Sequence, residues 1–221
     1  MPTKGTYAKG SARREEILAT ALQVIAEKGY HGTTLRGIGR ELGVEPAHIL
    51  YYFASREDLL REVIERWDAV SLTEPEPDAD ALEAFAAAIR RNLSIRGIVH
   101  LYLAFAAEAI DVEHPAHAFF RDRFTSVVEE LAATIAFGQE AGSIRPELDP
   151  DRTARQLVAL ADGLQLQALM DSTADAPTDL EATLDSLFVG GRRVRLARPY
   201  QLRPTPTDPT TPTSTSTEGP S

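Results

Sequence analysis

The sequence predicts an all-α protein in which a small N-terminal helix-turn-helix unit precedes a larger helical body. Apolar residues recur at spacings of three and four along most of the chain, and no segment shows the period-2 alternation of a half-buried strand. Between residues 33 and 60, two short amphipathic segments meet at a glycine corner, which is the construction of a helix-turn-helix. With 221 residues the chain can bury a full core and can hold more than one folding unit.

The first predicted helix runs over residues 13–29. Ile17, Ala21, Val24 and Ile25 form its apolar stripe, and Gly29 is expected to end it. The chain before this helix is expected to form a flexible arm.

The first helix of the motif is expected to begin after Thr34, whose hydroxyl can accept a hydrogen bond from a free backbone N–H. Its apolar face is predicted to consist of Leu35, Ile38 and Leu42. Gly39 leaves room for a second helix to cross closely. Gly43 is the expected left-handed residue that ends the helix.

The second helix of the motif is expected to begin at Pro46, where the missing N–H costs nothing, after a capping carboxylate from Glu45. Ile49 and Phe53 are predicted to face the core. The opposite face is predicted to carry Pro46, Ala47, His48, Leu50, Tyr51 and Tyr52. An exposed Leu-Tyr-Tyr run is costly in water unless something covers it, and DNA is the expected cover. For His48, simple solvation is the alternative to DNA contact.

Together these segments resemble the N-terminal domain of the tetracycline-repressor (TetR) family over residues 12–70. The resemblance rests on a basic pair at Arg13-Arg14, on Thr33-Thr34-Leu35-Arg36, on Gly43-Val44, on Tyr51-Tyr52-Phe53 and on Ser55-Arg56-Glu57-Asp58-Leu59. It implies a homodimeric transcription regulator, usually a repressor that a small effector releases from DNA. Glu45 stands where the family often has Ser, and Leu50 where it usually has Tyr, so the operator sequence does not follow from the resemblance.

The expected partner of the N-terminal unit is double-stranded DNA with a palindromic operator. The predicted DNA contacts are Arg36, Pro46, Ala47, His48, Leu50, Tyr51, Tyr52 and Arg56. The distribution of charge agrees with a DNA-binding N-terminal unit, although the net charge of the whole chain is −10. Residues 1–56 hold eight Lys or Arg and five Glu, a net charge of +3, which leaves −13 for the remainder.

We expect four parts in the chain. They are a flexible arm over residues 1–11, a DNA-binding domain over 12–72 with its motif at 34–53, an effector-binding and dimerisation domain over 78–191, and a disordered Pro/Thr/Ser-rich tail over 199–221. Helices are expected at residues 55–71, 79–93, 95–110, 115–141, 150–171 and 178–190. The first of these leads without a break from the DNA-binding unit into the body.

An effector pocket is expected inside the body, where bulky aromatic residues alternate with alanines. Its predicted wall consists of Trp67, His100, Tyr102, Phe105, Phe119, Phe124 and Gln165, each of which could instead be an ordinary core residue. The effector itself cannot be named from the sequence.

The helix over residues 150–171 is apolar around more than half of its circumference, so it needs cover on two sides. We expect a homodimer in which this helix and the last one form a four-helix bundle with their copies. The predicted interface consists of Leu157, Ala161, Leu164, Ala168, Leu180, Leu184 and Phe188. A helix fully buried in a monomer is the alternative.

Other functions find little support in the sequence. The chain has no cysteine, no activated-nucleophile motif and no glycine-rich phosphate loop, so we expect neither an enzyme nor a cofactor. No metal site is expected, although His100, His114 and His117 with Glu113 are a conceivable one. The chain has no apolar run long enough for a membrane span and no signal peptide, so a cytoplasmic location is expected.

Two alternatives stay open at this stage. The competing function is a helical small-molecule-binding module whose DNA binding is vestigial. Arg192, Arg193, Arg195 and Arg198 could form a nucleic-acid patch, or they could complement a helix dipole and remain solvated.

Overall fold

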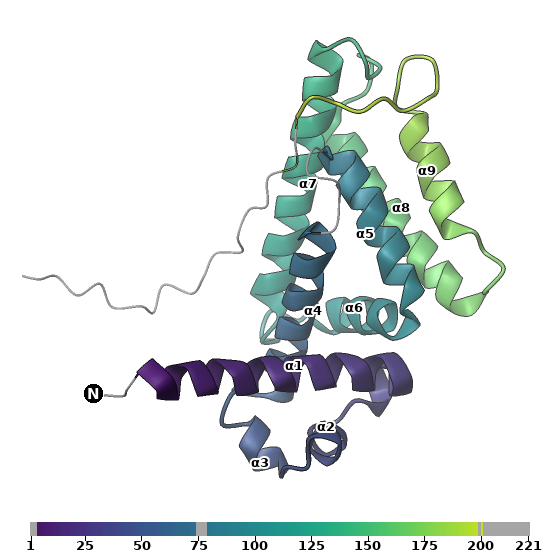
Figure 1. The fold of residues 1–221 in the computed structure, drawn as a ribbon. Coiled ribbons are helices and arrows are strands. Elements are labelled where there is room, and N and C mark those ends of the chain that lie inside the picture. Colours follow the sequence, from purple (N-terminus) through teal and green to yellow (C-terminus); the bar gives the residue numbers. More distant parts are fainter. Residues whose placement is uncertain (1–3, 74–78, 199, 201–221) are drawn as a thin grey trace, which may run out of the picture.

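The computed structural model of the protein describes residues 4–73, 79–198 and 200, and these residues form nine α-helices (Figure 1). The helices are α1 (Lys4–Gly32), α2 (Leu35–Leu42), α3 (Pro46–Ile49), α4 (Arg56–Thr73), α5 (Ala81–Ser94), α6 (Arg96–Glu108), α7 (His117–Glu140), α8 (Pro150–Met170) and α9 (Ala176–Asp185). Within the described ranges the only extended pairing is an isolated bridge, so the predicted all-α class is confirmed. No helix in this part of the chain is both long and apolar enough to cross a membrane.

The first helix is longer than the sequence predicted. α1 begins at Lys4 rather than Arg13, so residues 4–11 are helical and the expectation of a flexible arm was wrong for them. Gly5 and Gly10 weaken a helix there, but neither removes a backbone donor as a proline would. Gly29 interrupts the helix as expected, with φ 70° and ψ 179°, and the chain resumes a helical turn up to Gly32.

The DNA-binding unit and the body meet along α1. In Figure 1, α1 lies across the base of the body, α2 and α3 lie on its far side, and α4 rises from it. Helix α6 packs on the body side of α1, and Gly97 at its start lies directly against the α1 backbone. A Cβ atom at Gly97 would lie 2.1 Å from the carbonyl oxygen of Ile25, so a glycine is needed for this crossing.

The buried apolar side chains form two clusters. The N-terminal cluster consists of buried side chains between residues 17–67 and 98–120, and it joins α1–α4 to α6 and the start of α7. The C-terminal cluster consists of buried side chains between residues 81–89, 131–164 and 176–196, and it joins α5, α8 and α9 to the end of α7. The boundary between the clusters therefore runs through the body, above α6.

Helix α9 ends at Asp185, five residues before the predicted end. Leu187 and Phe188 leave the helix because they pair with the turn after α7. Phe188 forms the isolated bridge with Ile144, and the Leu187 carbonyl accepts a 3.0 Å hydrogen bond from the Arg145 N–H. Tertiary burial thus overrides the helical periodicity of this segment.

After α9 the chain returns across the body as a C-terminal strap, of which residues 192–198 and 200 are described. Leu196 is buried, and its N–H donates a 3.0 Å hydrogen bond to Oδ2 of Asp80, the residue that caps α5 through its Oδ1. The N–H of Tyr200 donates to the Ala79 carbonyl at 2.8 Å. The strap therefore fixes the start of α5.

The strap contains the four arginines that the sequence analysis left as a nucleic-acid patch or as solvated residues. Arg193 pairs with Glu181, Arg195 with Glu83, and Arg198 with Glu130, while Arg192 is exposed. Three of the four thus hold the strap to the body rather than forming an open basic patch. Apart from Tyr200, the tail predicted to be disordered lies outside the described residues.

The crossing of α6 over α1 generates a first prediction. Gly97→Ala should lower the free energy of unfolding by roughly 1–3 kcal/mol, because the new methyl group meets backbone that cannot rotate away. Gly10→Ala is the matched control, since a Cβ at Gly10 meets nothing within 4 Å. Urea unfolding followed by circular dichroism measures both. Equal midpoints for Gly97→Ala and the parent protein would show that the seam tolerates a side chain.

Candidate nucleic-acid interface and ligand-binding interior

The helix-turn-helix forms as its residues predict. Oγ1 of Thr34 accepts a 3.0 Å hydrogen bond from the Gly37 N–H, which caps α2. Gly43 ends the helix in the left-handed region, with φ 66° and ψ 32°. A Cβ at Gly39 would lie 2.6 Å from the Val44 carbonyl oxygen, so this glycine sets how closely the corner folds against α2.

Helix α3 is a single turn that starts at Pro46 and is anchored by the buried side chains of Ile49 and Phe53. The expected capping role of Glu45 was wrong. This residue occupies the N-cap position, but its side chain makes no capping hydrogen bond. The residues that cap well have shorter side chains, which place an oxygen closer to the first N–H groups.

The second helix of the motif ends at Ile49, earlier than predicted, so Leu50, Tyr51 and Tyr52 lie in the turn after α3. Together with His48 of α3 they form an exposed aromatic row. Tyr51 is 82% exposed and Leu50 is 45% exposed, and Ala47 and His48 are also exposed. The ring of Tyr52 stands between those of His48 and Tyr51, edge to face, with ring centroids 5.5 and 5.1 Å away. The row thus offers one imidazole and two phenol groups to a partner, and the buried Ile49 and Phe53 hold it in place.

The two predicted arginine anchors differ in their surroundings. Arg36 is exposed on α2, as is Arg40, which the prediction left out. Nε of Arg56 instead donates a 3.0 Å hydrogen bond to the Thr33 carbonyl, and its guanidinium lies 5.0 Å from the centre of the Tyr30 ring. Arg56 therefore joins the start of α4 to the end of α1, and less of it is free for phosphate.

Most of the predicted pocket aromatics lie in or against the N-terminal cluster. Their hub is Phe120, which the prediction missed. Its ring centroid lies between 5.1 and 6.4 Å from those of Tyr102, Phe105, Phe119 and Phe124. The adjacent pair Phe119-Phe120 was a visible signal, because one of two neighbouring aromatics on a helix must face inward.

His100 does not share this position. Its ring lies against α1, with centroids 5.3 Å from His31 and 6.1 Å from Tyr30. Helix α6 thus turns the His100 side chain toward the DNA-binding unit, away from the other predicted wall residues.

Buried hydrogen-bonding groups accompany the boundary between the two apolar clusters. Nε1 of Trp67 on α4 donates to Oδ1 of Asn92 on α5 at 2.6 Å. Nδ2 of Asn92 donates in turn to Oε1 of Gln165 on α8, at the long distance of 3.5 Å. Gln165 is almost fully buried. The first half of this polar layer thus connects α4, α5 and α8.

The second half of the polar layer is charged. Arg123 on α7 donates to both oxygens of Asp68 on α4, at 2.7 and 3.0 Å, and its guanidinium lies 4.8 Å from the centre of the Tyr102 ring. The Tyr102 hydroxyl hydrogen bonds to Asp162 on α8. Asp68 therefore pairs directly with the guanidinium, while Asp162 reaches the same cluster through the Tyr102 hydroxyl.

Burial shifts the ionisation of this charged half. It raises the pKa of Asp162, a shift that the Tyr102 hydrogen bond and the charge of Arg123 only partly oppose. Burial alone would lower the pKa of Arg123, but the Asp68 carboxylate raises it, so Arg123 stays charged. The layer is a set of buried and half-buried polar groups that satisfy one another, and a ligand with matching groups could exchange for them.

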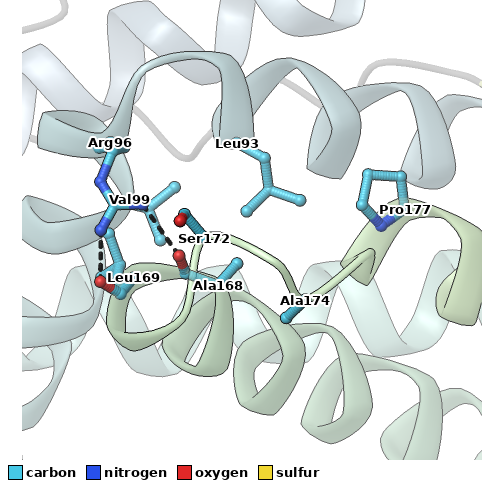
Figure 2. A pocket seen from close by; sticks show the side chains of 8 residues that line it. All are labelled: Leu93, Arg96, Val99, Ala168, Leu169, Ser172, Ala174 and Pro177. Carbon is cyan, nitrogen blue, oxygen red and sulfur yellow. Dashed lines mark hydrogen bonds between the residues drawn. The ribbon is translucent and has the colours of Figure 1, made fainter.

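The described structure also contains a cavity of about 200 Å³ at the far end of α8 (Figure 2). Its lining residues are Leu93, Arg96, Val99, Ala168, Leu169, Ser172, Ala174 and Pro177. None of the seven predicted pocket residues belongs to it. It lies between the α5–α6 corner and the loop that joins α8 to α9.

Most residues of the predicted dimer interface are not on the surface of the single chain. Leu157, Ala161, Leu164, Leu180, Leu184 and Phe188 are buried in the C-terminal cluster of their own chain, and Ala168 is half-buried. Periodicity showed correctly that α8 is apolar on several sides, but the strongest stripe faces its own body. The exposed apolar side chains of α8 are different ones, such as Leu166 and Met170.

The conceivable histidine metal site does not form. Within the described residues, no group of three or more His, Asp or Glu side chains is placed to hold a metal ion. Nδ1 of His114 instead accepts a 3.2 Å hydrogen bond from the Ala116 N–H at the approach to α7.

Comparison with known proteins gives matches over most of the chain. Residues 17–63 match the family model for bacterial regulatory proteins of the tetR family, and residues 77–189 match that for the C-terminal part of BetI-type transcriptional repressors. The transcriptional regulator PksA of Bacillus subtilis is 25% identical over 167 residues, which are 72% of this chain and 80% of PksA. RutR of Escherichia coli O157:H7 is 32% identical over 151 residues, which are 63% of this chain and 68% of RutR.

Solved structures agree. A transcriptional regulator from Saccharomonospora viridis in complex with choline superposes with a TM-score of 0.65 and 29% identity, over 80% of this chain and 95% of that one. A TetR-family regulator from Marinobacter aquaeolei VT8 has a TM-score of 0.63 over 81% and 93% of the two chains, and at 14% identity it shows the fold alone. All of these proteins are regulators of transcription, a class that is not enzymatic.

Proposed function

Because the chain belongs to the tetR family of bacterial regulatory proteins and is a transcriptional regulator, we propose that it is a homodimeric repressor that a small effector releases from its operator. The observation that carries this proposal is the exposed aromatic row at the end of α3 and in the turn after it. It is the part of the DNA-binding unit with most apolar surface open to water, and it sits at the position that a helix-turn-helix offers to the major groove.

The proposed DNA contacts combine three kinds of group. Tyr51, Tyr52 and His48 can donate hydrogen bonds to phosphates and base edges, and Leu50 and Ala47 can pack against thymine methyl groups. Pro46 starts the helix that carries them. Arg36 supplies charge toward the flanking phosphates, and Arg40 is exposed on the same helix to assist it. We assign Arg56 mainly to holding the unit together.

Removing the most exposed ring tests the DNA contacts. Tyr51→Ala should weaken specific operator binding by about 1–3 kcal/mol without loss of stability, because the side chain packs little on its own protein. Fluorescence anisotropy with labelled upstream DNA measures the affinity at fixed salt concentration. Ile110→Ala, which removes a 78% exposed side chain between α6 and α7, is the control. Operator affinity that is unchanged in folded Tyr51→Ala would contradict the assignment.

The dimer is proposed to form through the exposed stripe of α8. Ala159, Gly163, Leu166 and Met170 follow one another at spacings of four, three and four, so they share a face. A Cβ at Gly163 meets nothing within 4 Å, so nothing in its own chain requires a glycine there. Close approach of a second α8 would account for it. A two-fold dimer implies a palindromic operator with half-sites about one helical turn apart.

A charge in the stripe tests the dimer. Leu166→Asp should yield monomers that bind the operator poorly, because an unpaired buried carboxylate at a helix crossing costs roughly 3–5 kcal/mol. Val112→Asp, at a 70% exposed apolar position on the α6–α7 connection, is the matched control and should remain dimeric. Sedimentation velocity distinguishes the two states. A dimer that persists in Leu166→Asp would exclude this face.

The effector is proposed to bind at the polar layer, beside the aromatic residues of the N-terminal cluster. Trp67, Tyr102 and Gln165 take part in the layer, while Phe105, Phe119 and Phe124 flank it through Phe120. Support comes from the relative that holds choline, a small organic molecule, within the same fold. Trp67 and Asp68 belong to α4, so a ligand that replaces their partners acts on the helix that leads from α3.

Release requires that effector and operator oppose each other. We expect choline, as the first candidate, to bind more weakly in the presence of operator by the same factor by which it weakens operator binding, equivalent to about 1–3 kcal/mol. Trp67 is the only tryptophan, so its fluorescence reports the titration. Equal choline affinity with and without operator would exclude induction by choline. A lack of choline binding would exclude choline alone and leave the DNA contacts standing.

A further inference from the structure

The cavity at the end of α8 has the size and lining of a small-molecule site. Leu93 and Val99 face it from the α5–α6 corner, Ala168 and Ala174 face it from α8 and the following loop, and Pro177 closes one end (Figure 2). A volume of about 200 Å³ exceeds the 150 Å³ or so that suffices for benzene in a protein interior. The cavity therefore suits the apolar part of a small ligand, about the size of one aromatic ring.

The other end of the cavity is positively charged. Arg96 lines it there, and its guanidinium donates to the carbonyls of Ala168, at 3.0 Å, and of Leu169. In the part of the chain that the structure describes, no carboxylate lies within ion-pair distance of this guanidinium. The two carbonyls engage only two of its five N–H donors, so both charge and donors remain for a ligand. Ser172 also lines the cavity and adds a hydroxyl group to its wall.

The acidic residues nearest in sequence do not neutralise this end. Asp171 and Asp175 flank the loop, but neither lines the cavity. Oδ1 of Asp171 accepts hydrogen bonds from the N–H and hydroxyl of Thr173, and the Asp175 carboxylate accepts those of Thr178. Both carboxylates are thus held in the turns of their own loop.

We propose that this cavity binds a small organic acid, with its apolar body between Leu93, Val99 and Pro177 and its carboxylate on the free N–H groups of Arg96. A carboxylate matches the planar guanidinium better than any neutral acceptor does. The site shares no residue with the polar layer. It is therefore a second ligand site, beyond the proposed function, and its existence does not depend on DNA binding.

Three probes of one shape and different charge test the proposal on the full-length protein. Isothermal titration with benzoate, benzamide and benzylamine should give benzoate the highest affinity, roughly tenfold above neutral benzamide, with cationic benzylamine weakest. Equal affinities for benzoate and benzamide, a preference for benzylamine, or no benzoate binding at millimolar concentration would each overturn the proposal.

Variants of two cavity residues test whether benzoate binds in this cavity. Arg96→Gln should lose the preference for benzoate over benzamide, whereas Arg152→Gln, a matched exposed arginine at the opposite end of α8, should keep it. Because Arg96 also holds the last carbonyls of α8, a second variant leaves it in place: Ala174→Phe fills the cavity and should weaken both ligands. Benzoate binding that survives Ala174→Phe undiminished would place it elsewhere and refute the site. Operator binding should be unchanged in both cavity variants, so this proposal and the proposed repressor function fail separately.

Discussion

The close approach of Gly97 to the Ile25 carbonyl is the contact on which the arrangement of this protein depends. It brings α6 against α1, and α1 in turn carries α2, α3 and the start of α4. The Tyr30 hydroxyl donates to Glu108 at 2.6 Å further along the same seam, so α1 and α6 are joined both by packing and by a hydrogen bond. The DNA-binding unit is thus seated on the body by α1 as well as connected to it by α4. Any movement of α6 within the body acts directly on the base of this unit.

The local devices of the DNA-binding unit could be predicted because each depends on neighbours in sequence. The cap at Thr34, the left-handed turn at Gly43 and the close crossing at Gly39 follow from backbone geometry within a few residues. The incorrect prediction that Glu45 caps α3 also has a local cause, because its side chain is longer than that of a residue that caps well. The starts of α5, α8 and α9 were also predictable to within two residues, because an aspartate caps each of them.

The interior of the body was less accessible to prediction because its elements meet over long sequence separations. Periodicity identifies the apolar sides of α8 but not which of them its own chain covers, so a dimer face was assigned to core residues. The charged half of the polar layer joins Asp68, Tyr102, Arg123 and Asp162, which four different helices contribute. No spacing in the sequence relates these residues. Their pairing became visible only once the two apolar clusters were seen to leave a boundary between them.

The C-terminal strap changes where the body of this protein can be cut. The family match stops at residue 189, but Leu196 and Tyr200 still hydrogen bond to the start of α5, and Asp80 would lose one of its partners without them. A chimaeric regulator joined at residue 189 would therefore lack the C-terminal strap of its own body. The apolar surface beneath Leu196 would then be exposed. Exchange of effector-binding bodies among relatives, by recombination or by design, is best made with the junction beyond Tyr200.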